Sequence, residues 1–238
     1  KNILVLGSAP DALSARKWKV HPFDAIIAIN NAWQIRSDWT HSIFPTDFPK
    51  NRHPIPGKNQ SLHSAAEYVP IQNKYGGFVY AGGTMAFTAA YWALDVFKPK
   101  NIVFLGCDMI YSGNSNHFYG TGTADPLRDD LTLRSLEAKS ARFEVFAKMQ
   151  SCVPLNLSNL KNSRLVYDRV KLRDIAKKNR HDTRQFDYKK IKAAQLKEES
   201  LRYFIEDGKY WKCFDRFDQK EIDVLDNLWL SSIITNHR

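Results

Sequence analysis

The sequence predicts an α/β fold of the Rossmann-like, doubly wound type, with a mostly parallel sheet and a C-terminal helical appendage. Residues 2–6, 24–29 and 101–106 form nearly continuous apolar runs, which are typical of parallel strands covered on both faces. Segments with helical spacing alternate with these runs, as in a doubly wound sheet. A chain of 238 residues is long enough for one large domain, or for one domain and an appendage.

Weaker signals complete the expected domain. Further strands are expected at residues 42–44 and 153–157, with a Pro-rich loop after the first of them. Helices are expected from Gly82-Gly83-Thr84 to about residue 97, and over 133–149, where apolar residues recur at helical spacing. Residues 112–130 are rich in Gly, Asn and Asp, which predicts a long functional loop.

The composition changes near Leu165, so we expect a binding domain over 1–165 and a basic, aromatic, helical region over 166–238. Charged helices are expected over 173–201. An aromatic stretch follows, made of Tyr203, Phe204, Tyr210, Trp211, Phe214 and Phe217. We favour packing of these rings against the core; the alternative is peripheral contact with an anionic membrane surface.

Charge and cysteine content restrict the class of partner and the compartment. Lys and Arg number 35 against 25 Asp and Glu, a formal net charge of +10, which favours an anionic partner. Nucleic acid is not favoured, because no nucleic-acid-binding fold signature is present. Cys107, Cys152 and Cys213 are isolated in the sequence, which excludes a disulfide framework and a zinc pattern and predicts a cytoplasmic location.

Polar clusters follow the expected strands, where open α/β sheets bind their ligands. A Gly turn and a pair of amides suit close backbone approach and hydrogen bonding to a base or sugar, although both are also ordinary turn residues. The turn is not the dinucleotide fingerprint, because Ala9 and Leu13 replace its later glycines. The cluster residues are Gly7, Ser8, Ala9 and Pro10; Asn30 and Asn31; Thr46 and Asp47; and Gly106 with Asp108.

Two further groups are candidates. Gly82, Gly83 and Thr84 precede a helix, so their backbone amides could hold an anion or simply begin the helix. The most specific group is Asp108, Tyr111, His117 and Tyr119, which a strand end and a polar loop present together.

His117 has the side chain best suited to general-base chemistry near neutral pH. Nearby, Asp125, Asp129 and Asp130 could bind a metal or a hydroxyl. We favour the simpler interpretation, in which they cap the helix expected near residue 131.

These motifs resemble those of bacterial CMP-sialic acid sialyltransferases. The run from Gly7 to Leu13 is similar to their Gly-Asn-Gly-Pro-Ser-Leu turn, and Asn30 and Thr46-Asp47 fall near their donor-site asparagines. Gly82-Gly83-Thr84 resembles their Thr-Ser-Gly turn, and the run from Leu105 to Met109 resembles their Ser-Gly-Ile-Asp-Phe strand end. The run from Gly106 and Asp108 through Tyr111 to His117 and Gly120 also resembles the 6-hydroxymethylpterin pyrophosphokinase-like family, whose pattern is Gly-x-Asp-x-x-Tyr, a Gly-rich loop and a Thr-His-Ala-x-Gly element. That family includes motility-associated proteins implicated in flagellin glycosylation.

The resemblance covers about residues 2–157 and implies an enzyme, a glycosyltransferase that moves a sialic acid or Kdo-like sugar from a CMP-activated donor to a glycan or lipid-linked hydroxyl. It implies no required cofactor. Tyr111 and Tyr119 would contact the phosphate, Asn30 and Thr46 the sugar or nucleotide, and His117 would be the base. The family's own base is a His at a position that Ser135 occupies here.

Two alternatives remain open. One is a Mg²⁺-dependent pyrophosphokinase using ATP, with Asp108, Asp129 or Asp130 as ligands. The other is a nucleotide- or glycan-binding module without turnover, which the displaced His and the Gly83-for-Ser change would suit.

Overall fold

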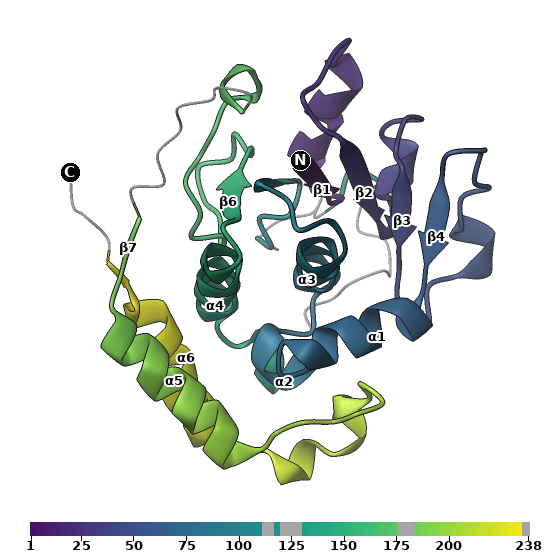
Figure 1. The fold of residues 1–238 in the computed structure, drawn as a ribbon. Helices are drawn as coiled ribbons and strands as arrows, with labels where there is room; N and C mark the ends of the chain where they lie inside the picture. Colours follow the sequence, from purple (N-terminus) through teal and green to yellow (C-terminus); the bar gives the residue numbers. More distant parts are fainter. Residues whose placement is uncertain (111–116, 120–129, 176–183, 235–238) are drawn as a thin grey trace.

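The computed structural model describes residues 1–110, 117–119, 130–175 and 184–234 (Figure 1). Its centre is a six-stranded, all-parallel sheet in the order β4-β3-β2-β1-β5-β6. The predicted α/β, Rossmann-like class is therefore confirmed. The strands are β1 (Asn2–Leu6), β2 (Ala25–Ile29), β3 (His41–Ile43), β4 (Ser61–His63), β5 (Asn101–Leu105) and β6 (Val153–Asn156).

Both faces of the sheet are covered, which explains why the central strands are apolar apart from Asn2 and Asn101 at the starts of β1 and β5. Ile3 and Val5 face one apolar cluster, whereas Leu4 and Leu6 face another, and all four side chains are fully buried. Alternate residues of a strand point to opposite faces. A strand with no polar side therefore belongs in the middle of a two-faced sheet.

One face carries the α-helices α1 (Ala65–Lys74), α3 (Met85–Phe97) and α4 (Leu136–Met149). Hydroxyl side chains begin two of them: Thr84 accepts a hydrogen bond from the Phe87 amide, and Ser135 accepts one from the Ala138 amide. The other face carries the 3₁₀ helices η1 (Pro10–Lys17), η2 (Asn30–Gln34) and η5 (Leu172–Asp174). The short helices η3 (Lys50–Arg52), α2 (Phe78–Ala81) and η4 (Leu131–Leu133) lie in connections.

The C-terminal region is helical as predicted and forms a third layer outside α4 (Figure 1). It contains β7 (Gln185–Phe186), α5 (Tyr188–Leu201), η6 (Tyr210–Lys212), η7 (Phe214–Arg216), α6 (Gln219–Ser231) and β8 (Ile233–Ile234). β7 and β8 pair antiparallel. Within the described part of the chain, no helix combines the length and apolar character that crossing a bilayer requires.

Two buried ion pairs attach this layer to α4. Lys139 Nζ lies 2.7 Å from Asp226 Oδ1, and Arg142 Nε lies 2.7 Å from Glu198 Oε1. Most rings of the aromatic stretch pack in the apolar cluster between the C-terminal layer and α4, which is the interpretation that we favoured. Tyr210, for example, is 2% exposed and stacks on Phe78. Phe204 and Trp211, 44% and 49% exposed, lie outside that packing.

Several predicted boundaries were wrong. The Pro-rich region beyond residue 44 runs into an unpredicted strand, β4, and then the unpredicted helix α1. Charged helices were expected over 173–201. That range contains α5, preceded by the end of η5 and by β7, with residues 176–183 outside the described set. The last strand ends at Asn156, one residue early.

The strand order creates one place where the chain changes direction across the sheet. Strands β2, β3 and β4 follow one another along the sheet on one side of β1. The chain then returns, and β5 pairs with the other side of β1. The carboxyl ends of β1 and β5 therefore flank the topological switch point, where open α/β sheets form their ligand crevice.

Candidate functional site

The turn after β1 lies against the end of β5, and this contact defines the switch point. The Gly7 amide donates to Leu105 O at 2.8 Å and the Ala9 amide donates to Gly106 O at 3.1 Å. A Cβ at Gly7 would lie 2.2 Å from Gly106 O. The glycine that we predicted for ligand approach is thus already required for packing between two strand ends.

Ser8 and His117 meet at this point. Ser8 Oγ lies 2.7 Å from His117 Nδ1, although the two residues are 109 positions apart. The Phe118 amide donates to Ser8 O at 2.8 Å, which fixes the two segments side by side. The structure therefore brings together two residues that the sequence identified separately.

The imidazole of His117 is buried and stacks on a neighbouring aromatic ring. Only 7% of the residue is exposed, and the Tyr119 ring stacks parallel to it with centroids 5.0 Å apart. Burial lowers the pKa of the His117 imidazole, because a charged ring loses hydration there. The neutral ring, which can accept a proton, is thus favoured at neutral pH.

Two carboxyl groups lie at the same end of the sheet. Asp108 follows β5 and is 1% exposed; its Oδ1 accepts from Asn156 Nδ2 at 3.4 Å, and its Oδ2 has no partner within the described residues. Both carboxyl oxygens of Asp11, in the first turn of η1, are also buried without a hydrogen bond of normal geometry to the described chain. Sequence reasoning selected Asp108 but not Asp11.

The charge of Asp108 acts on the Asp11 carboxyl. Burial raises the pKa of the Asp11 carboxyl, and the charge of Asp108 raises it further, while the nearby Ser158 hydroxyl opposes the shift. Like charges disfavour joint ionisation at close range. Asp11 therefore holds a proton more readily than an exposed aspartate.

The amide pair after β2 adds a further acceptor. Asn30 adopts a left-handed backbone conformation with φ of 50° and is 6% exposed. Its Oδ1 is buried without a partner among the described residues. Asn31 is also buried, and both begin η2. An amide oxygen held this way can accept a hydrogen bond from a ligand hydroxyl or amine.

Side chains from later in the chain fill the space beside the turn before α3. The Gly83 amide donates to Thr132 Oγ1 at 3.1 Å, and a Cβ at Gly83 would lie 2.0 Å from the Tyr210 hydroxyl. That hydroxyl donates to Asp130 Oδ2 at 2.8 Å. For Gly82, Gly83 and Thr84 the sequence left two interpretations, an anion site or the start of a helix. Thr84 caps α3, and the Gly83 amide is bonded internally. Only the complete chain could reveal this, since Thr132 and Tyr210 come from distant segments.

The remaining predicted residues have other positions. Asp130 caps η4 by accepting from the Thr132 amide at 2.8 Å, which is the capping role that we favoured. Thr46 and Asp47 follow β3 and are solvent-exposed. Pro10 begins η1 and is exposed. Tyr111, Asp125 and Asp129 lie outside the described residues.

No metal centre is apparent in residues 1–110, 117–119, 130–175 and 184–234: no three His, Cys, Asp or Glu side chains there are grouped to hold an ion. Cys107, Cys152 and Cys213 are unpaired thiols, as the sequence predicted. Cys107 lies beside the crevice, where burial raises its pKa.

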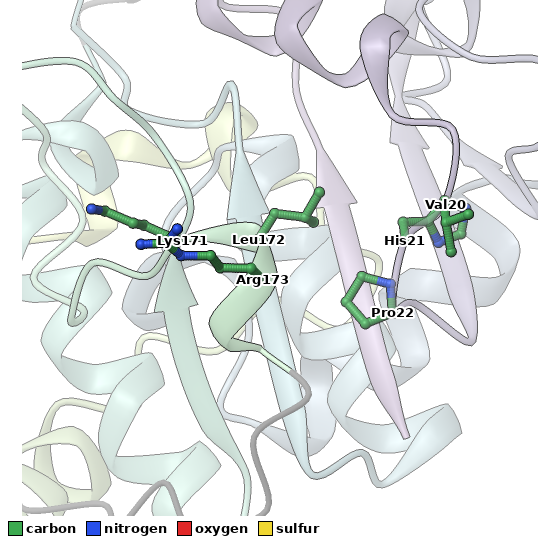
Figure 2. A pocket seen from close by; sticks show the side chains of 6 residues that line it. All are labelled: Val20, His21, Pro22, Lys171, Leu172 and Arg173. Atoms are coloured by element: carbon green, nitrogen blue, oxygen red, sulfur yellow. The ribbon is translucent and has the colours of Figure 1, made fainter.

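A separate groove of about 660 Å³ lies toward the amino ends of β1 and β2 (Figure 2). Pro22 lines it on one side, and its carbonyl accepts from Asn2 Nδ2 at the start of β1. Lys171 and Arg173 line the other side. None of the predicted site residues lies in this groove.

Comparison of the chain with protein-family models, with curated proteins and with solved structures finds no match in any of the three.

Proposed function

We propose that the protein is a glycosyltransferase that transfers a sialic acid or Kdo-like sugar from a CMP-activated donor to a hydroxyl of a glycan or lipid-linked acceptor. The reaction would take place in the crevice at the carboxyl ends of β1, β2 and β5. The observation that carries the proposal is the joint presence there of the Ser8–His117 hydrogen bond and buried, unpartnered acceptor oxygens.

The acceptor oxygens favour a ligand rich in hydrogen-bond donors. Asn30 Oδ1 and Asp108 Oδ2 are buried without a partner in the described chain, and both oxygens of Asp11 are buried without a hydrogen bond of normal geometry. A buried acceptor left unpaired costs roughly 1–3 kcal/mol. Hydroxyls of a sugar or ribose, and the amino group of cytosine, are donors that would remove this cost.

The Ser8–His117 pair supplies the proton acceptor for transfer. The acceptor hydroxyl oxygen bonds to the anomeric carbon as the bond from that carbon to the CMP phosphate breaks, and CMP leaves with the electron pair. The hydroxyl proton passes to the imidazole, directly or through the Ser8 hydroxyl that contacts Nδ1. General-base assistance of this kind contributes about 10²–10⁴-fold to a rate.

The proposed location is the cytoplasm, and the proposed acceptor lies at the inner face of the membrane. Unpaired thiols suit the reducing cytoplasm, and the exposed rings of Phe204 and Trp211 would suit an acceptor at the inner face of the membrane.

One observation favours a second candidate. The interacting carboxyl groups of Asp11 and Asp108 are the type of ligand through which Mg²⁺ is held together with substrate phosphates. This pair would suit the Mg²⁺-dependent, ATP-using pyrophosphokinase. A binding module without turnover would use the same crevice.

A thermal-shift panel with CMP, CDP, UDP, GDP and ATP, each with Mg²⁺ and with EDTA, separates these candidates. A ligand that binds only the native state stabilises that state by about 2.7 kcal/mol at a concentration 100 times its Kd. The melting midpoint rises as a result. The glycosyltransferase proposal predicts stabilisation by CMP or CDP that persists in EDTA and is lost in Asn30→Leu.

The other outcomes have equally definite meanings. Stabilisation by ATP with Mg²⁺ alone would replace the proposal with the pyrophosphokinase. Stabilisation by CMP without release of CMP from CMP-sialic acid or CMP-Kdo, in the presence of glycan acceptors, would favour the binding module. A matched control is Asn51→Leu, which changes an exposed asparagine on η3.

A further inference from the structure

Ser8 differs from an ordinary surface serine in what its hydroxyl touches and in how it is held. Its Oγ lies 2.7 Å from an imidazole nitrogen of His117. It lies in the turn between a buried strand and a helix, with its carbonyl bonded to the Phe118 amide. The hydroxyl and the imidazole are thus fixed with respect to one another by backbone as well as side-chain contacts.

Such a pair has the geometry of an activated nucleophile. A serine hydroxyl is a weak nucleophile by itself and becomes reactive when a base within about 2.6–3.2 Å takes its proton. The 2.7 Å separation falls in this range, and burial of the ring favours its neutral form, which can accept that proton. Tyr119 stacks on the imidazole and restricts its rotation.

We propose that Ser8, with His117 as its base, is a covalent nucleophile that reacts with activated acyl esters, an activity beyond the proposed sugar transfer that needs no nucleotide. In the first step Ser8 Oγ bonds to the acyl carbon and the ester C–O bond breaks. The Oγ proton moves to His117 Nδ1 and then to the departing alcohol. Water or a second hydroxyl then takes the acyl group from Ser8.

The acyl class follows from the pair itself. A serine hydroxyl with a neutral imidazole as its base is the arrangement that attacks an acyl carbon. Ser8 and His117 supply both parts, so acyl transfer is assigned to Ser8.

A neutral fluorophosphonate probe tests the proposal directly on the full chain. Ser8 Oγ would displace fluoride from phosphorus and retain the phosphonyl group, which peptide mass spectrometry locates. We expect a single main adduct, on Ser8. It should be absent in Ser8→Ala and form about 100-fold more slowly in His117→Gln, because the base contributes about that factor.

The control is Ser14→Ala, which removes a half-buried serine on the same helix η1 and should leave the adduct on Ser8 unchanged. Absence of an adduct on Ser8 in folded wild-type protein overturns the proposal. So does an adduct whose rate is the same in His117→Gln, since that would show only an accessible hydroxyl.

A second variant keeps the test decisive if His117→Gln does not fold. In Ser8→Cys the imidazole would promote the thiolate, so iodoacetamide should alkylate Cys at position 8 at least about 10-fold faster than Cys213 at pH 7. Cys107 and Cys152 are buried and give little background. Equal rates would contradict the proposal. Neither labelling experiment contains nucleotide. A negative result in them would therefore contradict the acyl-transfer proposal without bearing on the glycosyltransferase proposal.

Discussion

Replacing Gly7 by alanine tests whether the switch point depends on direct contact between two strand ends. The added Cβ would lie 2.2 Å from Gly106 O, 2.7 Å from Cys107 Sγ and 2.8 Å from the Gly106 carbonyl carbon. Two of these three atoms are backbone, so no side-chain rotation relieves the overlap. The end of β1 must move away from β5, and the Gly7 and Ala9 hydrogen bonds to β5 lengthen.

The expected cost is about 3 kcal/mol in the free energy of unfolding, at the upper end of the usual 1–3 kcal/mol for overpacking. Urea unfolding followed by tryptophan fluorescence measures it. Gly57→Ala is the matched control, because the nearest atom to its Cβ is the side-chain Oε1 of Gln60 at 3.5 Å; its effect should stay within about 0.5 kcal/mol.

The same variant should also move Ser8 relative to His117. Fluorophosphonate labelling of Ser8 would then fall in Gly7→Ala protein that is still folded in the absence of urea. If Gly7→Ala and Gly57→Ala have equal stability, the strand contact is not as tight as described and this reasoning is refuted.

Three further predictions concern other parts of the fold. Lys139→Met leaves Asp226 buried without its partner 2.7 Å away and should cost about 3–5 kcal/mol in urea unfolding; Lys139→Met/Asp226→Leu should recover most of that, and no recovery would contradict the pairing. Burial lowers the pKa of His41 to about 4, below its unfolded value near 6.5. His41 therefore contributes stability that is present above pH 6.5 and is lost as the pH falls toward 4; His41→Phe should weaken this loss in melts between pH 7 and 4, and an unchanged profile would be inconsistent with it. Tyr210→Phe removes the hydroxyl that donates to buried Asp130 and should lower stability by about 1–3 kcal/mol, whereas Tyr188→Phe, at an exposed position on α5, should have little effect; equal melting points for the two would argue against the buried bond.

The central strands could be predicted because burial on both faces leaves a simple pattern. Apart from Asn2 and Asn101, which begin β1 and β5, the residues of β1, β2 and β5 are apolar without alternation, as is typical of parallel strands covered on both faces. β4 could not be predicted, because its three residues Ser61, Leu62 and His63 have no apolar pattern, and pairing with β3 stabilises the strand.

The site was predictable as a set of strand ends and not as a set of contacts. Ser8, Asn30, Asp108 and His117 could each be selected because they follow apolar runs or lie in a polar loop. Their pairing depends on the β1–β5 contact, which is non-local. The filling of the Gly83 turn by Tyr210 depends on how the C-terminal region packs, and no local signal contains that information.

The most direct test of the proposed function is release of CMP from a CMP-activated sialic acid or Kdo donor in the presence of glycan acceptors. Wild-type protein and His117→Gln would be assayed in parallel after equal melting points show that both are folded. Wild-type protein should release CMP in EDTA in an acceptor-dependent way, and the rate should fall about 100-fold in His117→Gln. CMP release that is absent from wild type with both donors, or equal in the two proteins, would contradict the proposed function.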